Sequence, residues 1–182
     1  MIIKETELSG AYLIDLEKRE DERGFFARYY CESEFKNNKL EVNWLQVNNS
    51  LSVNKGTLRG LHFQQSPHSE VKLIRCVKGA IWDVIVDVRL NSKTYGKWFG
   101  RELNADNRTM MYVPKGFAHG FISLENNSEI LYMVSEPYNP QYERTLRWND
   151  EFHGIVWPID PNTISEKDTN VKVWDHSNAV NI

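Results

Sequence analysis

Between residues 57 and 135 the chain alternates short runs of β-branched and aromatic residues with turn residues. This spacing of strands and turns is typical of a β-sandwich or a β-barrel. Within residues 80–89, Trp82 and Val84 fall on one face of a strand, whereas Asp83 falls on the other. The pattern therefore predicts an all-β fold, and it leaves open whether the mixed face meets solvent or lines a polar interior.

Individual strands and one short helix can be placed from the same pattern. The clearest local signal is a hairpin, with strands at 71–77 and 80–89 joined by a turn at Lys78 and Gly79. Later strands are expected at residues 97–103, 110–113, 118–124 and 129–134. Helical patterning is limited to Glu32–Leu40, which predicts a short peripheral helix.

A chain of 182 residues is long enough for one domain with a sizeable core. We expect a β core over residues of about 40–138, followed by an extension over about 139–182 that wraps on it. The extension has few strand-like runs, but its Trp148, Trp157 and Trp174 require an apolar surface to bury against. A single domain covering the whole chain is therefore predicted.

The charge balance argues against several classes of partner. Lysine and arginine number 22 and aspartate and glutamate 25, so the formal net charge is −3. A nucleic-acid-binding surface requires clustered positive charge, and no run of basic residues supplies it. The amino terminus is charged where an export signal would be apolar, and no apolar run approaches the ~20 residues of a membrane span. We expect a cytoplasmic protein whose Cys31 and Cys76 are reduced thiols.

Two of the five histidines, His62 and His119, lie among apolar, strand-like neighbours. Histidine titrates near neutral pH and can transfer protons, although a strand histidine is more often a hydrogen-bonded core residue. A metal site in a small β-barrel would require a His-x-His pair followed by further ligands. His62 and His68 are six residues apart with Pro67 between them, so no metal is expected. No glycine-rich phosphate loop occurs, which disfavours nucleotide hydrolysis and dinucleotide redox chemistry.

Seven segments along the chain carry a more specific signal. They are 21–26 (DERGFF), 46–50 (QVNNS), 56–64 (GTLRGLHFQ), 72–75 (KLIR), 114–121 (PKGFAHGF), 148–150 (WND) and 164–168 (ISEKD). In this order and spacing, they resemble the dTDP-4-dehydrorhamnose 3,5-epimerase family over nearly the whole chain. The resemblance implies a jelly-roll β-sandwich of the cupin type with short peripheral helices. It also implies a homodimer, with an amino-terminal strand that can cross to the partner, and catalysis without a metal or organic cofactor.

The substrate implied by the resemblance is a nucleotide diphosphate 4-keto-6-deoxyhexose. Epimerisation at C3 and C5 would convert dTDP-4-dehydro-6-deoxy-D-glucose to dTDP-4-dehydro-L-rhamnose. The C4 ketone acidifies the hydrogens on both carbons, so the reaction requires a base, an acid on the opposite face and a group that stabilises the enolate. By the family's pattern, His62 is the base, Asp168 orients it, and Tyr132 is the acid. Lys72 matches the position that stabilises the enolate oxygen.

The resemblance also assigns seven residues to substrate binding. Contacts to the diphosphate are implied for Arg23, Arg59, His119 and Lys167, and contacts near the nucleoside for Gln46, Asn48 and Tyr138. Arginine matches phosphate oxygens in geometry, and a tyrosine ring can stack on a base. Arg59 and His62 have opposite parity along a strand, so both can face one cavity only where a bulge or a strand end intervenes.

One position departs from the family's pattern. Where many members carry a glutamate two residues after Phe26, this chain has Arg28, which joins the candidate substrate-binding residues. A guanidinium donates hydrogen bonds and cannot accept one from thymine N3–H, so a CDP-linked sugar is an alternative substrate. Epimerisation at C3 alone is a second alternative. From other classes, a cupin that binds the nucleotide sugar without turnover and a metal-dependent cupin enzyme stay open.

Overall fold

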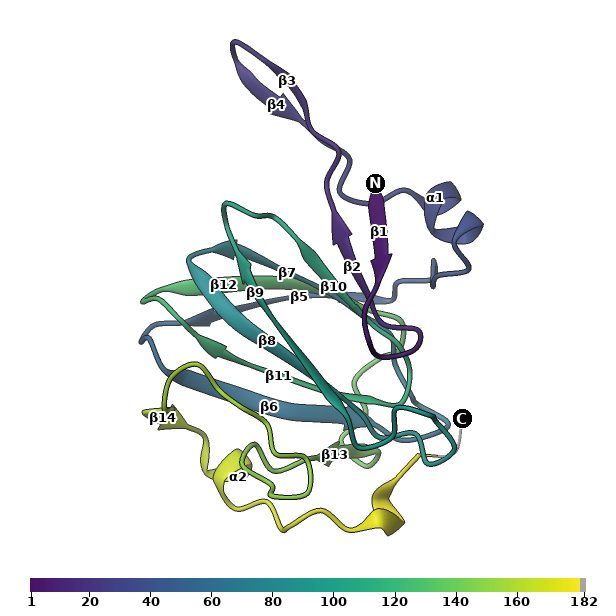
Figure 1. The fold of residues 1–182 in the computed structure, drawn as a ribbon, viewed down its shortest axis with the longest axis vertical. Coiled ribbons are helices and arrows are strands. Elements are labelled where there is room, and N and C mark those ends of the chain that lie inside the picture. Colours follow the sequence, from purple (N-terminus) through teal and green to yellow (C-terminus); the bar gives the residue numbers. More distant parts are fainter. Residues whose placement is uncertain (181–182) are drawn as a thin grey trace.

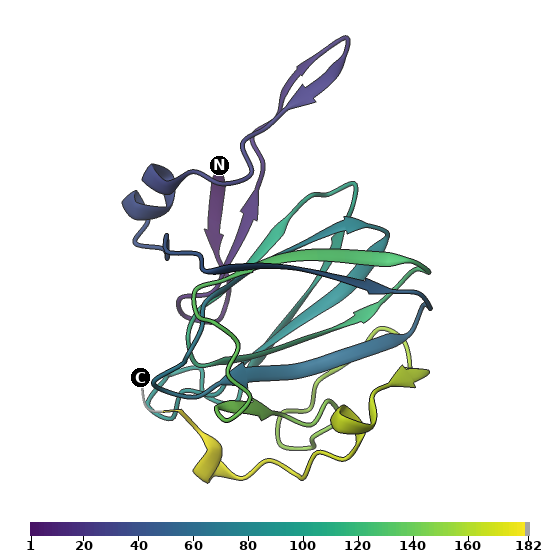
Figure 2. The same ribbon diagram turned by 180° about the vertical axis from the view of Figure 1, so that it is seen from behind.

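Two β-sheets packed face to face form the body of the protein (Figure 1 and Figure 2). The structure, a computed structural model, describes residues 1–180. Its strands are β1 (Ile2–Glu5), β2 (Tyr12–Asp15), β3 (Arg19–Asp21), β4 (Gly24–Phe26), β5 (Gln46–Ser52), β6 (Thr57–Gln64), β7 (Lys72–Lys78), β8 (Ala80–Asp87), β9 (Trp98–Asn104), β10 (Met110–Val113), β11 (Phe117–Ser123), β12 (Ser128–Val134), β13 (Glu143–Thr145) and β14 (Thr163–Ile164). Its helices are α1 (Glu32–Asn37), α2 (Glu166–Thr169) and the 3-10 helix η1 (His176–Asn178).

The order of the strands is that of a jelly roll. The first sheet has the order β1-β2-β10-β7-β12-β5, and the second has β13-β6-β11-β8-β9 with β14 parallel to β6. From β5 to β13 the chain passes from one sheet to the other at every connection except the one between β8 and β9. The predicted all-β sandwich with short peripheral helices is therefore confirmed.

The predicted hairpin over residues 71–89 is wrong, because its two strands lie in different sheets. β7 pairs with β10 and β12, whereas β8 pairs with β9 and β11. Cys76 of β7 and Ile81 of β8 instead belong to one buried core between the sheets. The turn at Gly79 connects a strand of the first sheet to a strand of the second. A turn sequence indicates where a strand ends but not which strand it pairs with, and here both strands pair with segments distant in the sequence.

The apolar face of β8 is covered by the C-terminal segment. Val84 is fully buried in a cluster against which Trp148, Trp157 and Trp174 pack. In Figure 1 this segment, coloured green to yellow, runs along the side of the second sheet that faces away from the first. The tryptophans thus have the apolar surface that burial of their rings requires.

The mixed face of β8 points into the interior. Ile85 belongs to the core between the sheets, and Asp83 is fully buried. A carboxylate in such a place requires hydrogen-bond partners, and Asp83 meets Nε2 of His119 at 2.7 Å. The interior of the sandwich is therefore partly polar. The mixed face of β8 lines this polar interior and does not meet solvent, which were the two alternatives that the sequence left open.

The short helix α1 covers the outer face of the first sheet. Phe35 is fully buried there in a cluster with Ile14 and Tyr112. The helix ends at Asn37, three residues before the predicted end at Leu40. Lys39 follows with a φ of 58°, a left-handed conformation that ends a helix.

A bulge lies where β6 and β11 pair. His62 is opposite His119, but Arg59 is opposite Phe121, so β6 has one residue more than β11 between the two pairs. The extra residue reverses the parity of β6, and Arg59 and His62 line the same cavity. Of the two alternatives that the opposite parity of Arg59 and His62 required, a bulge or a strand end, the structure has the bulge.

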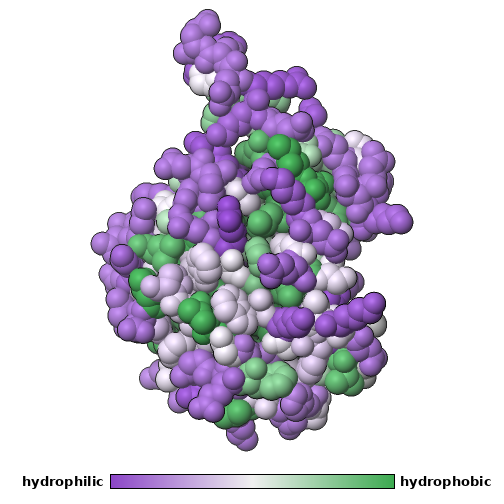
Figure 3. All heavy atoms as spheres, in the orientation of Figure 1, coloured by the Kyte–Doolittle hydropathy of each residue, from purple (hydrophilic) through white to green (hydrophobic). Residues whose placement is uncertain are grey.

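The β3–β4 hairpin projects away from the sandwich, at the top of Figure 1. Phe25 and Phe26 on it are 42% and 63% exposed. Figure 3 shows that the hairpin is largely hydrophilic and that hydrophobic surface lies below its base, over the amino-terminal strands. Within residues 1–180, no helix is long and apolar enough to cross a membrane.

Replacement of Gly60 tests the close approach of β6 to β11. In Gly60→Ala the new Cβ would lie 2.5 Å from the Cα of Gly120, at a φ of +121°. Gly24→Ala is the matched control, because Gly24 has a φ of +125° and no atom within 4 Å of a Cβ. Urea unfolding should show a loss of about 1–2 kcal/mol in Gly24→Ala from backbone strain. Gly60→Ala should lose roughly 3 kcal/mol or more, and equal losses in the two variants would contradict the close approach.

Candidate active site

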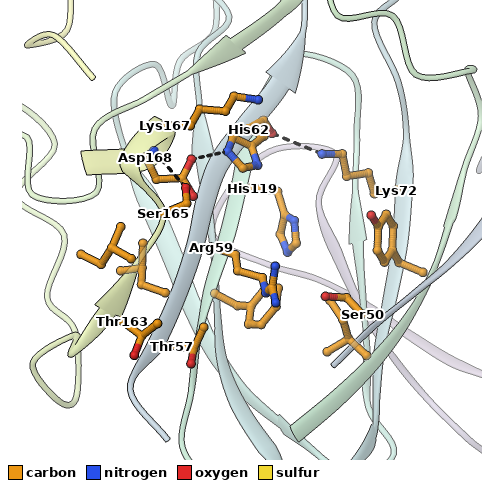
Figure 4. Close-up of a pocket in the computed structure, with 15 residues that line it drawn as sticks. Ser50, Thr57, Arg59, His62, Lys72, His119, Thr163, Ser165, Lys167 and Asp168 are labelled. Atoms are coloured by element: carbon orange, nitrogen blue, oxygen red, sulfur yellow. Dashed lines mark hydrogen bonds and ion pairs between the residues drawn. The ribbon is translucent and has the colours of Figure 1, made fainter. Parts of the chain in front are cut away.

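A cavity of about 460 Å³ lies between the two sheets (Figure 4). Its walls come from β5, β7 and β12 of the first sheet, from β6 and β11 of the second, and from residues 163–168. A second cavity of about 340 Å³ lies beside it. His62, Lys72 and Tyr132 line both cavities, so these three side chains mark where the two meet.

His62 and Asp168 form a hydrogen-bonded pair on one side of the cavity. The distance from His62 Nε2 to Asp168 Oδ1 is 2.7 Å, and the amide of Gly60 donates to Asp168 Oδ2 at 3.3 Å. Ser165 caps α2 by accepting from the amide of Asp168, and this cap fixes the carboxylate against β6. The bulge and the helix cap thus bring together two residues 106 positions apart.

The electrostatics of the pair favour an ionised Asp168. Burial by itself would raise the pKa of this carboxyl, but the hydrogen bond and charge of His62 and the amide of Gly60 outweigh it and lower the pKa. A carboxylate only accepts hydrogen bonds, so the proton between the two groups lies on Nε2 of His62. Among the described residues nothing bonds to Nδ1 of His62, and this nitrogen is therefore the one that can take a proton.

Tyr132 faces the cavity from the opposite sheet. It lies on β12, and burial raises the pKa of its phenol, with a further rise from the charge of Glu70 and an opposing effect from Arg59. At neutral pH the phenol therefore stays protonated and can donate a proton.

Lys72 lies beside Tyr132 on the neighbouring strand β7. Its ammonium donates to the backbone carbonyl of His62 at 3.2 Å and lies 3.1 Å from Glu70 Oε1. The lysine therefore holds a positive charge at the point where the two cavities meet.

Two further basic residues line the first cavity from β6 and β11. Arg59 donates to the carbonyl of Leu51 at 3.1 Å, and its Nε lies 3.4 Å from Ser52 Oγ. His119 is buried and held by Asp83, and its ring shares the cavity wall with Arg59. Arg59 can present N–H donors to an anion, as the family resemblance implies for the diphosphate. With Nε2 of His119 held by Asp83, Nδ1 is the ring nitrogen left for the cavity.

The second cavity contains the residues predicted to lie near the nucleoside. Gln46, Asn48 and Tyr138 all line it. The Tyr138 hydroxyl donates to Glu143 Oε2 at 2.8 Å, and Lys167 reaches the same oxygen at 2.5 Å. Burial raises the pKa of the Glu143 carboxyl, but the hydrogen bonds from Lys167 and Tyr138 lower it overall. Glu143 therefore connects Lys167, a predicted diphosphate contact, with Tyr138 at the predicted nucleoside end of the site.

Arg23 and Arg28 do not reach either cavity of their own chain. Arg23 is an exposed residue of the β3–β4 hairpin and pairs with Asp21 at 2.6 Å. Arg28 lines a separate surface depression near the amino terminus, where its charge acts on Glu34. Ten of the twelve predicted site residues thus line the two connected cavities, and these two arginines lie elsewhere.

Three acidic residues at the site were missed from the sequence, namely Glu70, Asp83 and Glu143. Acidic residues at strand ends and in loops usually lie in solvent, so Glu70 and Glu143 carried no signal. For Asp83 a signal existed, because it shares its strand face with the apolar Ile85. Among residues 1–180 no group of three or more His, Cys, Asp and Glu side chains could hold a metal ion. The expectation that catalysis needs no metal stays a prediction.

Jelly-roll sandwiches that place a His–Asp pair across an interior cavity from a tyrosine and a lysine form a class of cupin-type enzymes suited to acid–base chemistry. Comparison with known proteins identifies the member of that class. The family model described as dTDP-4-dehydrorhamnose 3,5-epimerase matches residues 5–176, and the chain belongs to this family. It is therefore an epimerase, in the isomerase class.

Individual relatives agree with the family assignment. The dTDP-4-dehydrorhamnose 3,5-epimerase of Methanothermobacter thermautotrophicus is 45% identical over 170 residues, which cover 92% of this chain and 91% of the relative. The crystal structure of the Elizabethkingia anophelis enzyme has a TM-score of 0.92 and 40% identity, covering 96% of each chain. The Legionella pneumophila enzyme, solved in complex with dTDP-4-keto-L-rhamnose, has a TM-score of 0.91 and 32% identity, covering 100% of this chain and 98% of that one.

Proposed function

We propose that this protein epimerises C3 and C5 of dTDP-4-dehydro-6-deoxy-D-glucose and so forms dTDP-4-dehydro-L-rhamnose. The observation that carries the proposal is the meeting of His62, Lys72 and Tyr132 in one cavity, with Asp168 behind the histidine. Membership of the family supports the reaction, and the sugar bound to the Legionella pneumophila relative supports the substrate.

In the proposed mechanism Nδ1 of His62 removes the proton from the carbon next to the C4 ketone. The C–H electrons form a carbon–carbon double bond, and the carbonyl electrons move to the C4 oxygen, giving an enolate. The ammonium of Lys72 stabilises the charge on that oxygen, and Tyr132 then donates a proton to the opposite face of the carbon. Exchange with water restores the proton of Tyr132 and removes that of His62, and the cycle repeats at the second carbon.

The remaining cavity residues suit the rest of the substrate. Arg59 and Lys167 supply N–H donors at one end for two phosphate groups, and His119 lies beside Arg59 in the same wall. Gln46, Asn48 and Tyr138 lie at the other end for the nucleoside. The dTDP-sugar bound to the Legionella pneumophila relative supports thymidine as the nucleoside. The cytoplasmic location stays a prediction from the sequence.

The active form is proposed to be a homodimer in which the β3–β4 hairpin reaches the partner's site. The hairpin projects from its own chain, and Arg23 on it has an 83% exposed side chain although the sequence predicts a phosphate contact. Exposed apolar residues on β5, Val47 and Leu51, mark a sheet surface that a second copy would cover. Arg23 and Arg28 would then act on the partner's substrate.

Deuterium uptake tests the reaction and the nucleotide together. The protein is incubated in deuterated water with dTDP-4-dehydro-6-deoxy-D-glucose or with its CDP counterpart, and the sugar is measured by mass spectrometry. Two deuteriums in the dTDP-sugar, and none in the CDP-sugar on the same timescale, are expected. Uptake of one would mean epimerisation at C3 alone, a preference for CDP would assign Arg28 to cytosine, and no uptake would indicate a binding protein without turnover.

Variants of the two proton-transfer residues test their separate roles. His62→Asn should lower kcat by on the order of 10³-fold or more, because the base is lost. Tyr132→Phe should retain exchange at the carbon that His62 deprotonates but form no epimerised product. Both should bind dTDP with a Kd close to that of the wild type by calorimetry, since neither residue contacts the diphosphate. A large loss of dTDP affinity, or full product yield in Tyr132→Phe, would contradict the roles.

Complementation between variants tests the shared site of the dimer. Arg23→Ala and His62→Asn should each be nearly inactive alone. After mixing and exchange of subunits, half of the dimers are mixed, and one of their two sites has both Arg23 and His62. Activity should therefore return to about a quarter of the wild-type value. If the mixture stays as inactive as its components while native mass spectrometry, with an affinity tag on one variant, shows that mixed dimers form, the hairpin does not complete the partner's site.

A further inference from the structure

Glu70 lies in the wall of the second cavity and contacts Lys72, and the proposed mechanism gives it no role. It lies in the segment between β6 and β7, and its side chain is 11% exposed. It lines the second cavity together with Lys72 and Tyr132. A carboxylate this buried requires partners on both oxygens, and both are present.

Each carboxylate oxygen of Glu70 faces a different donor. Oε1 lies 3.1 Å from the ammonium of Lys72, and Oε2 accepts from the side-chain amide of Gln64 at 3.3 Å. The ammonium also donates to the carbonyl of His62 at 3.2 Å. An ammonium has three N–H donors, so two fixed acceptors leave one donor for the cavity. Glu70 therefore sets the direction of the one donor that a substrate oxygen can use.

Gln64 connects Glu70 to the nucleoside end of the site. This side chain is buried, and its amide nitrogen also lies 3.1 Å from the carbonyl of His68 and 3.3 Å from that of Pro137. Its two N–H bonds are therefore shared among three acceptors, one of which is Glu70. The Oε1 of Gln64 accepts from the amide of Asn139 at 2.6 Å. Gln64 thereby holds both neighbours of Tyr138, which lies at the nucleoside end. One hydrogen-bonded network thus runs from Lys72 to Tyr138.

We propose that Glu70 is a positioning residue for the proton-transfer site: it fixes Lys72 for the enolate oxygen and couples it, through Gln64, to the segment that carries Tyr138. This inference rests on the proposed role of Lys72. An amide cannot replace the carboxylate, because its NH2 group would face either the ammonium of Lys72 or the amide nitrogen of Gln64. Loss of the carboxylate would also leave the buried ammonium without its ionic partner.

The charge of Glu70 also acts on Tyr132. It raises the pKa of the phenol in addition to the effect of burial, whereas Arg59 lowers it. The other charged or titratable side chains that line the two cavities are His62, Lys72, His119, Tyr138, Glu143, Lys167 and Asp168. Removal of the negative charge of Glu70 should therefore let Tyr132 ionise at lower pH.

The test compares Glu70→Gln with Glu102→Gln in the wild-type background. Glu102 is the matched control, since its exposed carboxylate on β9 also accepts from an amide side chain, that of Asn104, at 2.7 Å. Glu70→Gln should lower kcat by about tenfold or more with little change in the Kd for dTDP. The alkaline limb of its kcat–pH profile should move to lower pH. Glu102→Gln should match the wild type in every measurement.

A double-mutant cycle shows whether Glu70 acts through Lys72. In Lys72→Met the ammonium is absent, so adding Glu70→Gln should lower kcat by no more than about twofold further. The double variant removes both buried charges together, so its comparison with Lys72→Met stays measurable where Glu70→Gln alone folds poorly. The inference is overturned if Glu70→Gln keeps kcat within twofold and the pH profile unchanged, or if the two substitutions are additive. A wild-type protein that exchanges no deuterium would instead refute the proposed function.

Discussion

The bulge at Gly60 is the constraint on which the candidate site depends. It adds one residue to β6 opposite β11, and this residue turns Arg59 and His62 into the same cavity. The same backbone amide donates to Asp168, whose other oxygen holds His62. A side chain at this position would collide with Gly120, so the irregularity exists only because both strands carry glycine there. The backbone of Gly60 thus affects both the register of β6 and the position of the His62–Asp168 pair.

The elements outside the two sheets cover parts of their outer faces, and a polar cavity lies between the sheets. α1 covers part of the outer face of the first sheet, and the C-terminal segment covers part of that of the second. Because apolar side chains are also buried in these two places, the space between the sheets can contain polar groups at one end without loss of the apolar core. The C-terminal segment also carries Asp168. The segment that helps to bury Val84 therefore also places a carboxylate next to His62.

The sequence predicted what depends on local alternation and missed what depends on pairing. The strands appear where period-two patterns place them, and the opposite parity of Arg59 and His62 correctly required a bulge. The hairpin over residues 71–89 failed because a turn does not specify which strands lie side by side. The partnership of His62 and Asp168 came from the family resemblance alone, since no periodicity links positions so far apart. Glu70 and Glu143 were missed because an acidic residue in a loop or at the end of a strand gives no sign that it is buried.

Each of three basic groups in the cavities is paired with an acidic residue. Lys72 pairs with Glu70, Lys167 with Glu143, and His62 with Asp168. One carboxylate does not use all three N–H bonds of an ammonium, so each lysine keeps donors for a ligand, and His62 keeps Nδ1 for proton transfer. Desolvation of the cations is thus largely compensated before substrate arrives, and a diphosphate adds contacts to side chains that are already oriented. Preorganisation of this kind lets a buried base, acid and cation coexist in a sandwich core.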